Sequence, residues 1–338
     1  KKKKKFSFRG ISHAGHGLFN NNNNNNNKSN NGITNVAEYT KRTPSADSDI
    51  PWTVNGQILH KCAFMDHLLR CYKSKASMNQ KRPSDHPPPN FIFMGHSFGC
   101  YVIQQMLVLR PDILKLTRGC IYLMPFVRMN ANTTFNQWKL KTVSKYPRAL
   151  IRVGTTFSHI LSKCLSPQSL ERILKLSPIG RIDSPEARSI TVQLMTRPTF
   201  VTNFFELGTK EIRYLPSDID VDAYQTITDR CPIHMIYTAN DQWAPKFHMD
   251  ELQQLQSQNI LPSATTTDKL VMTYIPNLKH DYVTDPRMSK IVVDWCFESI
   301  QKISRRDDTE ATQQHNHQVR TTRQFDGRHS FPKLRSKL

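Results

Sequence analysis

The chain has 338 residues, a hydrophobic content of 38% and a formal net charge of +20. That length is enough for one large α/β domain, and no run approaches the roughly 18 apolar residues of a membrane-spanning helix. The N-terminus is charged and no apolar segment follows it, so we expect no secretory signal. Seven cysteines without framework spacing indicate reduced thiols in a cytosol-facing protein.

A positive charge of this size is typical of proteins that bind nucleic acid or anionic membrane surfaces. Part of it lies in Lys1–Lys5 and in a basic tail, residues 304–338, that we expect to be disordered. No zinc-knuckle, RNA-recognition or helix-turn-helix signature is present, so we expect no nucleic-acid partner. A basic surface with modest attraction to anionic lipid head groups fits better. We expect no metal and no cofactor.

The first predicted element is a short alternating strand, Phe6–Ile11, and a Gly-rich turn follows it at Ser12–Gly17. A homopolymeric Asn run opens a polar insertion over about residues 20–35, which we expect to be disordered. Apolar residues at helical spacing predict a helix over Val54–Tyr72. A proline-rich linker, Arg82–Asn90, leads into the next strand.

The central pattern of the sequence is a strand, a short glycine-containing turn and a helix. The apolar run Phe91–Met94 predicts a buried strand, and Tyr101–Leu109 predicts a helix. Between them, Gly95-His96-Ser97-Phe98-Gly99 fits the Gly-x-Ser-x-Gly nucleophile elbow. A serine in such a turn exposes its hydroxyl at the carboxyl end of the sheet. The five-residue pattern is weak by itself, but the flanking strand and helix favour a catalytic role.

The elbow assigns a role to three further residues. We expect side chains at Gly95 and Gly99 to clash, because strand and helix pass closely there. The main-chain N–H of Phe98 follows the nucleophile at the helix N-terminus, so it is the candidate oxyanion donor.

The pattern of alternating strands and helices continues beyond the elbow helix. Gly119–Phe126 predicts the next buried strand, and this order favours a mostly parallel sheet with helices on both faces. Val127–Thr228 is punctuated by prolines and mostly helical, as in Ala149–Leu161 and Ser169–Leu176, and predicts an inserted helical cap.

The sheet pattern then resumes with strands at Ile233–Thr238 and Leu270–Ile275. Helices are predicted over Asp250–Gln258 and Met288–Ile303. We therefore expect one α/β domain over residues 6–303.

Two further residues complete a candidate catalytic triad in the chain order Ser97, Asp241, His280. Asp241 and His280 each follow a predicted strand, and the carboxyl ends of parallel strands meet at one edge of a sheet. His280 would deprotonate Ser97, and Asp241 would hold the imidazole. Taken singly, Asp241 also fits an ordinary turn and His280 a surface loop. Weaker acid candidates are Asp218, Asp220, Asp222 and Asp281.

At these motifs the chain resembles the lipid droplet-associated hydrolase family. The resemblance runs from about Phe6 to Ile303 and rests on five separated segments: Ile11–His16, Val54–Lys61, Gly95–Tyr101, Asn240–Pro245 and His280–Val283. It implies an α/β-hydrolase fold and a serine lipid hydrolase at the cytosol-facing surface of lipid droplets and the endoplasmic reticulum. Sterol-ester hydrolysis is the implied activity, with Ser97, Asp241 and His280 as the triad.

The resemblance also carries an expectation about the N-terminal side. Phe6–His16 is similar to the strand and turn that follow the oxyanion loop in this fold, and Lys1–Lys5 does not replace that loop. We therefore expect the earlier strands, and with them the second oxyanion donor, to be missing from this sequence.

The sequence is compatible with three functions. The first is an ester hydrolase that acts on neutral lipids such as sterol esters, with a role in lipid storage. The second is a non-catalytic protein that organises lipid droplets with the same fold. The third is a soluble hydrolase of small esters.

Overall fold

The computed structural model describes residues 53–78, 89–129, 135–176, 182, 184–239, 241–262 and 268–305. Several predicted features lie outside these residues: the strand Phe6–Ile11, the turn Ser12–Gly17, the Asn-rich insertion, most of the linker Arg82–Asn90 and the tail beyond residue 305.

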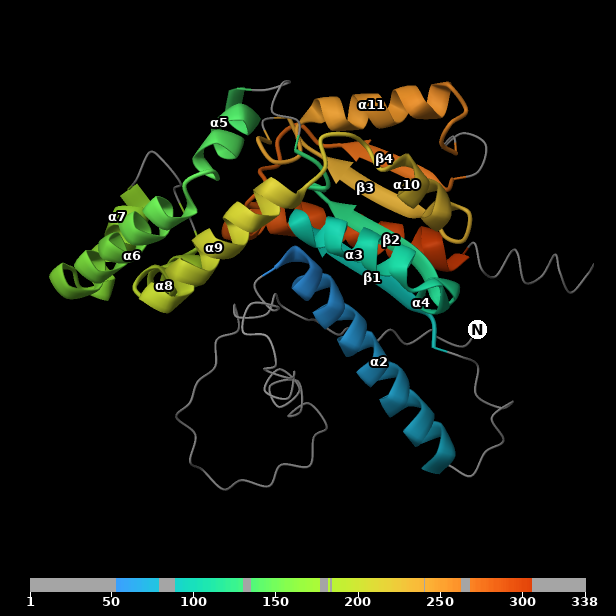
Figure 1. Cartoon of the computed structure of the whole chain (residues 1–338), viewed down its shortest axis with the longest axis horizontal. Coiled ribbons are helices and arrows are strands. Elements are labelled where there is room, and N and C mark those ends of the chain that lie inside the picture. The colour runs from blue at the N-terminus through green and yellow to red at the C-terminus, as the bar shows by residue number, and fades with distance from the viewer. Residues whose placement is uncertain are drawn as a thin grey trace, which may run out of the picture.

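A four-stranded parallel sheet forms the centre of the described chain (Figure 1). Its strands are β1 (Phe91–His96), β2 (Thr117–Leu123), β3 (Ile233–Tyr237) and β4 (Leu270–Tyr274), and they pair in chain order. The α/β class and the parallel sheet predicted from the sequence are confirmed. Because all four strands run the same way, their carboxyl ends lie along one edge, where the polar loops gather.

Helices cover both faces of this sheet. In Figure 1, α3 and α10 lie in front of the strands, and the last helix, residues 286–305, lies behind them. Ile303 of that helix packs so closely on β2 that a Cβ atom at Gly119 would lie 2.8 Å from it. The other helices that pack around the sheet are α2 (Val54–Met78), α3 (Phe98–Leu109), α4 (Pro111–Lys115), α10 (Val221–Thr228) and α11 (Lys246–Ser257).

Burial explains why the two middle strands are largely apolar, with Thr117, Arg118 and His234 as their polar residues. Every residue of β3 is buried, and Arg118 alone is exposed in β2. Tyr122, Ile121 and Met235 have no exposed surface. A parallel strand covered on both faces has no polar side, so its sequence does not alternate.

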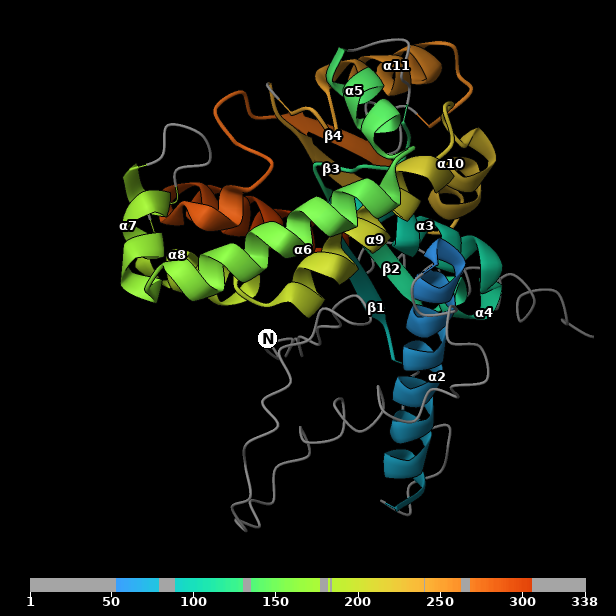
Figure 2. The ribbon, with the colours of Figure 1, turned by 60° about the vertical axis from the view of Figure 1, so that its left-hand side comes forward.

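A separate group of helices, which we call the cap helices, lies beside the sheet (Figure 2). Four of its helices begin at a proline, a residue favoured in the first helical turn because it has no N–H to satisfy. At Gly154, α6 approaches α9 so closely that a Cβ atom would lie 2.3 Å from the ring of Phe205. The cap helices are α5 (Phe135–Val143), α6 (Pro147–Cys164), α7 (Pro167–Leu176), α8 (Pro185–Met195) and α9 (Pro198–Tyr214).

The predicted elements differ from those of the structure by one to six residues at their ends, and two differences from the sequence-based expectation affect the architecture. The strand predicted over Gly119–Phe126 ends at Leu123, because Met124 has a φ of 45° and turns the chain out of the sheet. The helix α10 lies within the range expected for the cap, but it packs on α3, and its Tyr224 and Ile227 belong to the sheet core.

Within the described ranges, no helix is both long enough and apolar enough to cross a membrane.

Candidate active site

The elbow predicted around Ser97 is present, with one residue between strand and helix. β1 ends at His96 and α3 begins at Phe98, so Ser97 makes the whole turn. Its φ of 54° and ψ of −128° are values that residues other than glycine rarely adopt. Backbone strain of this kind is typical of functional sites and persists only where the surroundings fix it.

Main-chain hydrogen bonds from the end of β2 fix this turn. The N–H of Ser97 donates to the carbonyl of Leu123 at 2.9 Å. The carbonyl of Ser97 accepts from the N–H of Phe126 at 3.2 Å and from that of Cys100 at 3.1 Å. Leu123 and Phe126, on either side of the turn at Met124, thus bind the two peptide units that flank the strained serine.

The two glycines of the motif have different roles. A Cβ atom at Gly95 would lie 2.9 Å from the main-chain nitrogen of Cys100 and 2.9 Å from the carbonyl carbon of Gly99. The expected clash therefore exists at Gly95. At Gly99 the expectation is wrong: a Cβ atom there would meet nothing within 4 Å in the described part of the chain. Gly99 lies on the open side of the first helical turn, away from the strand.

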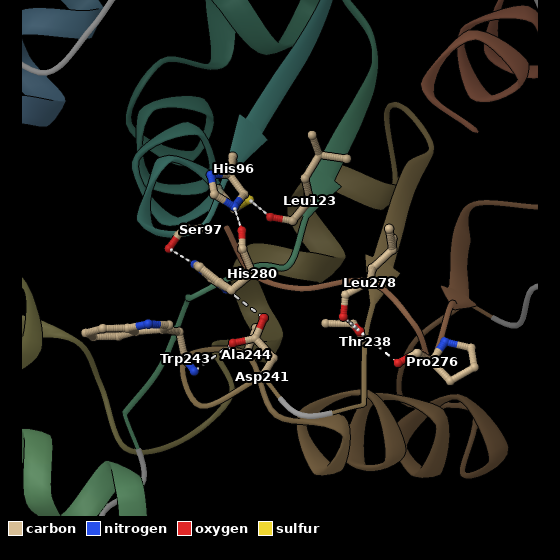
Figure 3. Close-up of polar contacts among 11 residues, drawn as sticks. His96, Ser97, Leu123, Thr238, Asp241, Trp243, Ala244, Pro276, Leu278 and His280 are labelled. Atoms are coloured by element: carbon tan, nitrogen blue, oxygen red, sulfur yellow. Dashed lines mark hydrogen bonds and ion pairs between the residues drawn. The ribbon is translucent and has the colours of Figure 1, made fainter. Parts of the chain in front are cut away.

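Ser97, His280 and Asp241 form one continuous chain of hydrogen bonds (Figure 3). The Nε2 atom of His280 lies 2.8 Å from the Oγ atom of Ser97, and its Nδ1 atom lies 2.6 Å from Oδ2 of Asp241. The side chain of Asp241 has no exposed surface, whereas 19% of the His280 side chain is exposed. The base is thus partly accessible to solvent, and the acid behind it is closed to solvent.

Asp241 is held by the turn that follows it. Its Oδ1 atom accepts hydrogen bonds from the N–H of Trp243 at 2.8 Å and from the N–H of Ala244 at 3.0 Å. These main-chain donors compensate the buried carboxylate and leave Oδ2 for His280. An aspartate that accepts from main-chain groups two and three residues ahead is typical of turns, so the local sequence is compatible with this arrangement.

Thr238 is a supporting residue that the sequence analysis did not identify. It follows β3, and its hydroxyl donates to the carbonyl of Leu278 in the loop that carries His280, at 2.5 Å. This contact joins the loop of the acid to the loop of the base. Local sequence gives no signal for it, because the two residues are 40 positions apart.

The other acidic candidates lie outside this hydrogen-bond chain. The carboxylate of Asp220 caps α10 by accepting from the N–H of Ala223 at 3.0 Å. Asp218, Asp222 and Asp281 are exposed. Among the described residues, no group of three or more His, Cys, Asp or Glu side chains is arranged to hold a metal ion.

Comparisons with solved structures give weak overall likenesses. An esterase from Thermogutta terrifontis is 13% identical with a TM-score of 0.42, over 74% of this chain and 73% of that one. The α/β hydrolase MGS-M2 from a Medee basin deep-sea metagenome library is 15% identical with a TM-score of 0.43, over 73% and 72%. A monoacylglycerol lipase from Paleococcus ferrophilus is 12% identical with a TM-score of 0.36, over 70% and 74%.

A search of curated proteins finds no match. The family model described as "Lipid-droplet associated hydrolase" matches residues 1–283, a range that includes the elbow, Asp241 and His280. The matched range also includes all four strands of the described sheet. The chain belongs to the lipid-droplet associated hydrolase family.

Proposed function

We propose that this chain is a serine ester hydrolase that acts on neutral lipids, such as sterol esters, at the cytosol-facing surface of lipid droplets and the endoplasmic reticulum, with a role in lipid storage. The observation that carries the proposal is the unbroken sequence of short contacts from Asp241 through His280 to Ser97. The three residues occupy the roles of acid, base and nucleophile in acyl transfer.

The first half of the proposed reaction forms an acyl-enzyme. The Oγ atom of Ser97 attacks the ester carbonyl carbon while Nε2 of His280 takes the hydroxyl proton. The main-chain N–H of Phe98, at the N-terminus of α3, is the proposed donor to the oxyanion. Collapse of the tetrahedral intermediate breaks the bond to the alcohol oxygen, which leaves with the proton from His280.

The second half releases the fatty acid. Water gives a proton to His280 and attacks the acyl carbon, and the returning proton restores the hydroxyl of Ser97. Throughout, Asp241 accepts from Nδ1–H and stabilises the imidazolium that forms. Because the side chain of Asp241 is excluded from solvent, this charge interaction is screened less than it would be at the surface.

The exposed face of α6 supports a lipid surface as the place of action. Val153, Phe157 and Ile160 are 70%, 53% and 52% exposed, and their spacing places them along one side of the helix. A different side of α6, which contains Gly154, packs against α9. Exposed Arg148, Arg152 and Lys163 lie on the same helix, a composition typical of helices that lie on anionic lipid surfaces.

The experiment that tests this function separates labelling from turnover. We expect a fluorophosphonate probe to label the purified wild-type protein and to fail on Ser97→Ala. We also expect the wild type to release fatty acid from a cholesteryl oleate emulsion. A wild-type protein that is folded and not labelled would contradict the serine-hydrolase proposal. Labelling together with turnover of p-nitrophenyl butyrate, but not of the emulsion, would favour a hydrolase of small soluble esters.

A further inference from the structure

His96, the first of the two variable residues of the elbow motif, makes close contact with the candidate catalytic base. Its Nε2 atom lies 2.9 Å from the main-chain oxygen of His280. A carbonyl oxygen only accepts hydrogen bonds, so Nε2 of His96 carries the proton and donates it. The two residues are 184 positions apart in the chain, and this bond joins the turn of the nucleophile to the loop of the base (Figure 3).

The ring of His96 also packs on that loop. Its centroid lies 4.9 Å from the centroid of the His280 ring, at an interplanar angle of 42°. The ring of Tyr282 meets it edge-on, with centroids 5.2 Å apart at 84°. One side chain therefore contacts the main chain of His280, its imidazole and the residue two positions further on.

We propose that His96 is the positioning residue for the catalytic base: its Nε2–H holds the carbonyl of His280 and thereby sets the distance between His280 and Ser97. This inference rests on the proposed triad. Since His96 and Ser97 are adjacent, a movement of the elbow carries the nucleophile and the anchor of the base together. The separation of Oγ and Nε2 is then set by one peptide unit and one hydrogen bond, rather than by the whole sheet.

The protonation state of His96 is consistent with this role. Burial and the neighbouring His280 lower the pKa of His96 to about 4, while the hydrogen bond to the His280 carbonyl, Asp241 and Asp281 act in the opposite direction. His96 is therefore neutral at physiological pH, with one ring nitrogen as the donor. A neutral ring beside His280 adds no charge repulsion when that imidazole becomes protonated during turnover.

Two substitutions separate the hydrogen bond from the packing. His96→Phe keeps an aromatic ring but has no donor, whereas His96→Gln places an amide N–H near the position of Nε2 without the ring. We expect His96→Phe to lower kcat for p-nitrophenyl butyrate by about 10–100-fold with little change in KM, since a misplacement of about 1 Å has costs of that order. We expect His96→Gln to restore a large part of that loss.

Two kinetic outcomes would overturn the inference. A kcat of His96→Phe within about twofold of the wild type would show that the donor is not needed. An equal loss in both variants would assign His96 to packing alone. The melting temperature of each variant verifies that the folded state is compared. His96→Leu, which also has no donor, replaces His96→Phe if that variant does not fold.

A spectroscopic readout keeps this test independent of the proposed activity. The short bond between Nδ1–H of His280 and Asp241 is expected to give a low-field proton resonance without any substrate. We expect His96→Phe to broaden or shift that resonance and His96→Gln to retain it. A resonance unchanged in His96→Phe would refute the positioning role. If the resonance responds to the two substitutions as expected but the wild type hydrolyses no ester, the proposed function is refuted and the role of His96 stands.

Discussion

The imidazole of His280 lies 2.8 Å from the hydroxyl of Ser97, although 183 positions separate the two residues in the chain. Both side chains come from the carboxyl ends of parallel strands, β1 and β4, which are the outer members of the described sheet. The contact crosses two intervening strands by way of loops. The candidate site is thus assembled from both borders of the sheet.

Ser97→Ala tests this contact directly. We expect the substitution to lower ester turnover by about 10³-fold or more, because the covalent route is lost and only binding and oxyanion stabilisation remain. The hydroxyl lies at a turn and fills little core volume, so we expect the melting temperature to change by only a few degrees. Turnover and thermal unfolding of the two proteins are measured in parallel. Residual turnover within tenfold of the wild type would contradict the assignment of Ser97.

The sequence was sufficient to predict the parts of the site that have local signals. The run Phe91–Met94 and the motif after it predict a strand, a turn and a helix without reference to the rest of the chain. Asp241 and His280 could be chosen because each follows a strand, and parallel strands bring their carboxyl ends together. The hydrogen bonds of the structure connect these three residues.

Features that depend on long-range contacts were not predicted. The apolar run predicts that β2 ends at Phe126, because such a run does not reveal the positive φ of Met124 that ends the strand at Leu123. The motif predicts a steric need for Gly99, but whether a Cβ atom there clashes depends on its surroundings in the fold, which are open in the described part of the chain. Thr238 and His96 act on loops distant in sequence, so no pattern of period or spacing marks them.

The two elbow glycines form a matched pair for stability. Gly95→Ala places a methyl group 2.9 Å from main-chain atoms that cannot move without disturbing α3, and we expect a loss of about 2–3 kcal/mol in the free energy of unfolding. Gly99→Ala has open space and a helical position, so we expect a gain of about 0.5 kcal/mol. Urea unfolding measures both. Equal destabilisation would mean that Gly99 also lies at a close approach of the backbone.

The pH dependence of stability provides a test at Glu211 of α9. Burial raises the pKa of Glu211 from 4.5 to about 8. Between these values the folded protein binds a proton that the unfolded chain has released, so stability falls as the pH rises through this window. Glu211→Gln removes the ionisable group and keeps the shape. We expect its melting temperature to equal that of the wild type near pH 5 and to exceed it increasingly toward pH 9.

Glu206→Gln is the control for this measurement. Glu206 lies on the same helix, and its carboxylate pairs with Lys210 at 2.8 Å. We expect this substitution to give no gain that grows with pH. If the two glutamine variants gave the same pH profile, the effect would come from the net charge of the helix and not from the burial of Glu211.

The exposed side of α6 gives the last prediction, which concerns droplet association. We expect a triple variant, Val153→Gln, Phe157→Gln and Ile160→Gln, to reduce the fraction of protein that floats with lipid droplets. Each of these side chains would bury much of its apolar surface in the monolayer, a contribution on the order of 1–2 kcal/mol, so their joint loss lowers the affinity more than tenfold. Because they are exposed, we expect the folded state and esterase turnover in solution to persist.

A second exposed apolar pair separates this effect from a general loss of hydrophobicity. Val293 and Phe297 of the helix over residues 286–305 are 63% and 61% exposed, close to the values of the α6 residues. This helix covers a face of the sheet and is not part of the cap, so Val293→Gln with Phe297→Gln should leave flotation unchanged (Figure 1). Flotation on a density gradient, quantified for both variants, decides the matter. An equal loss of flotation in both variants would show that the lipid contact is not specific to α6. Full flotation of the α6 variant would exclude that helix as the contact.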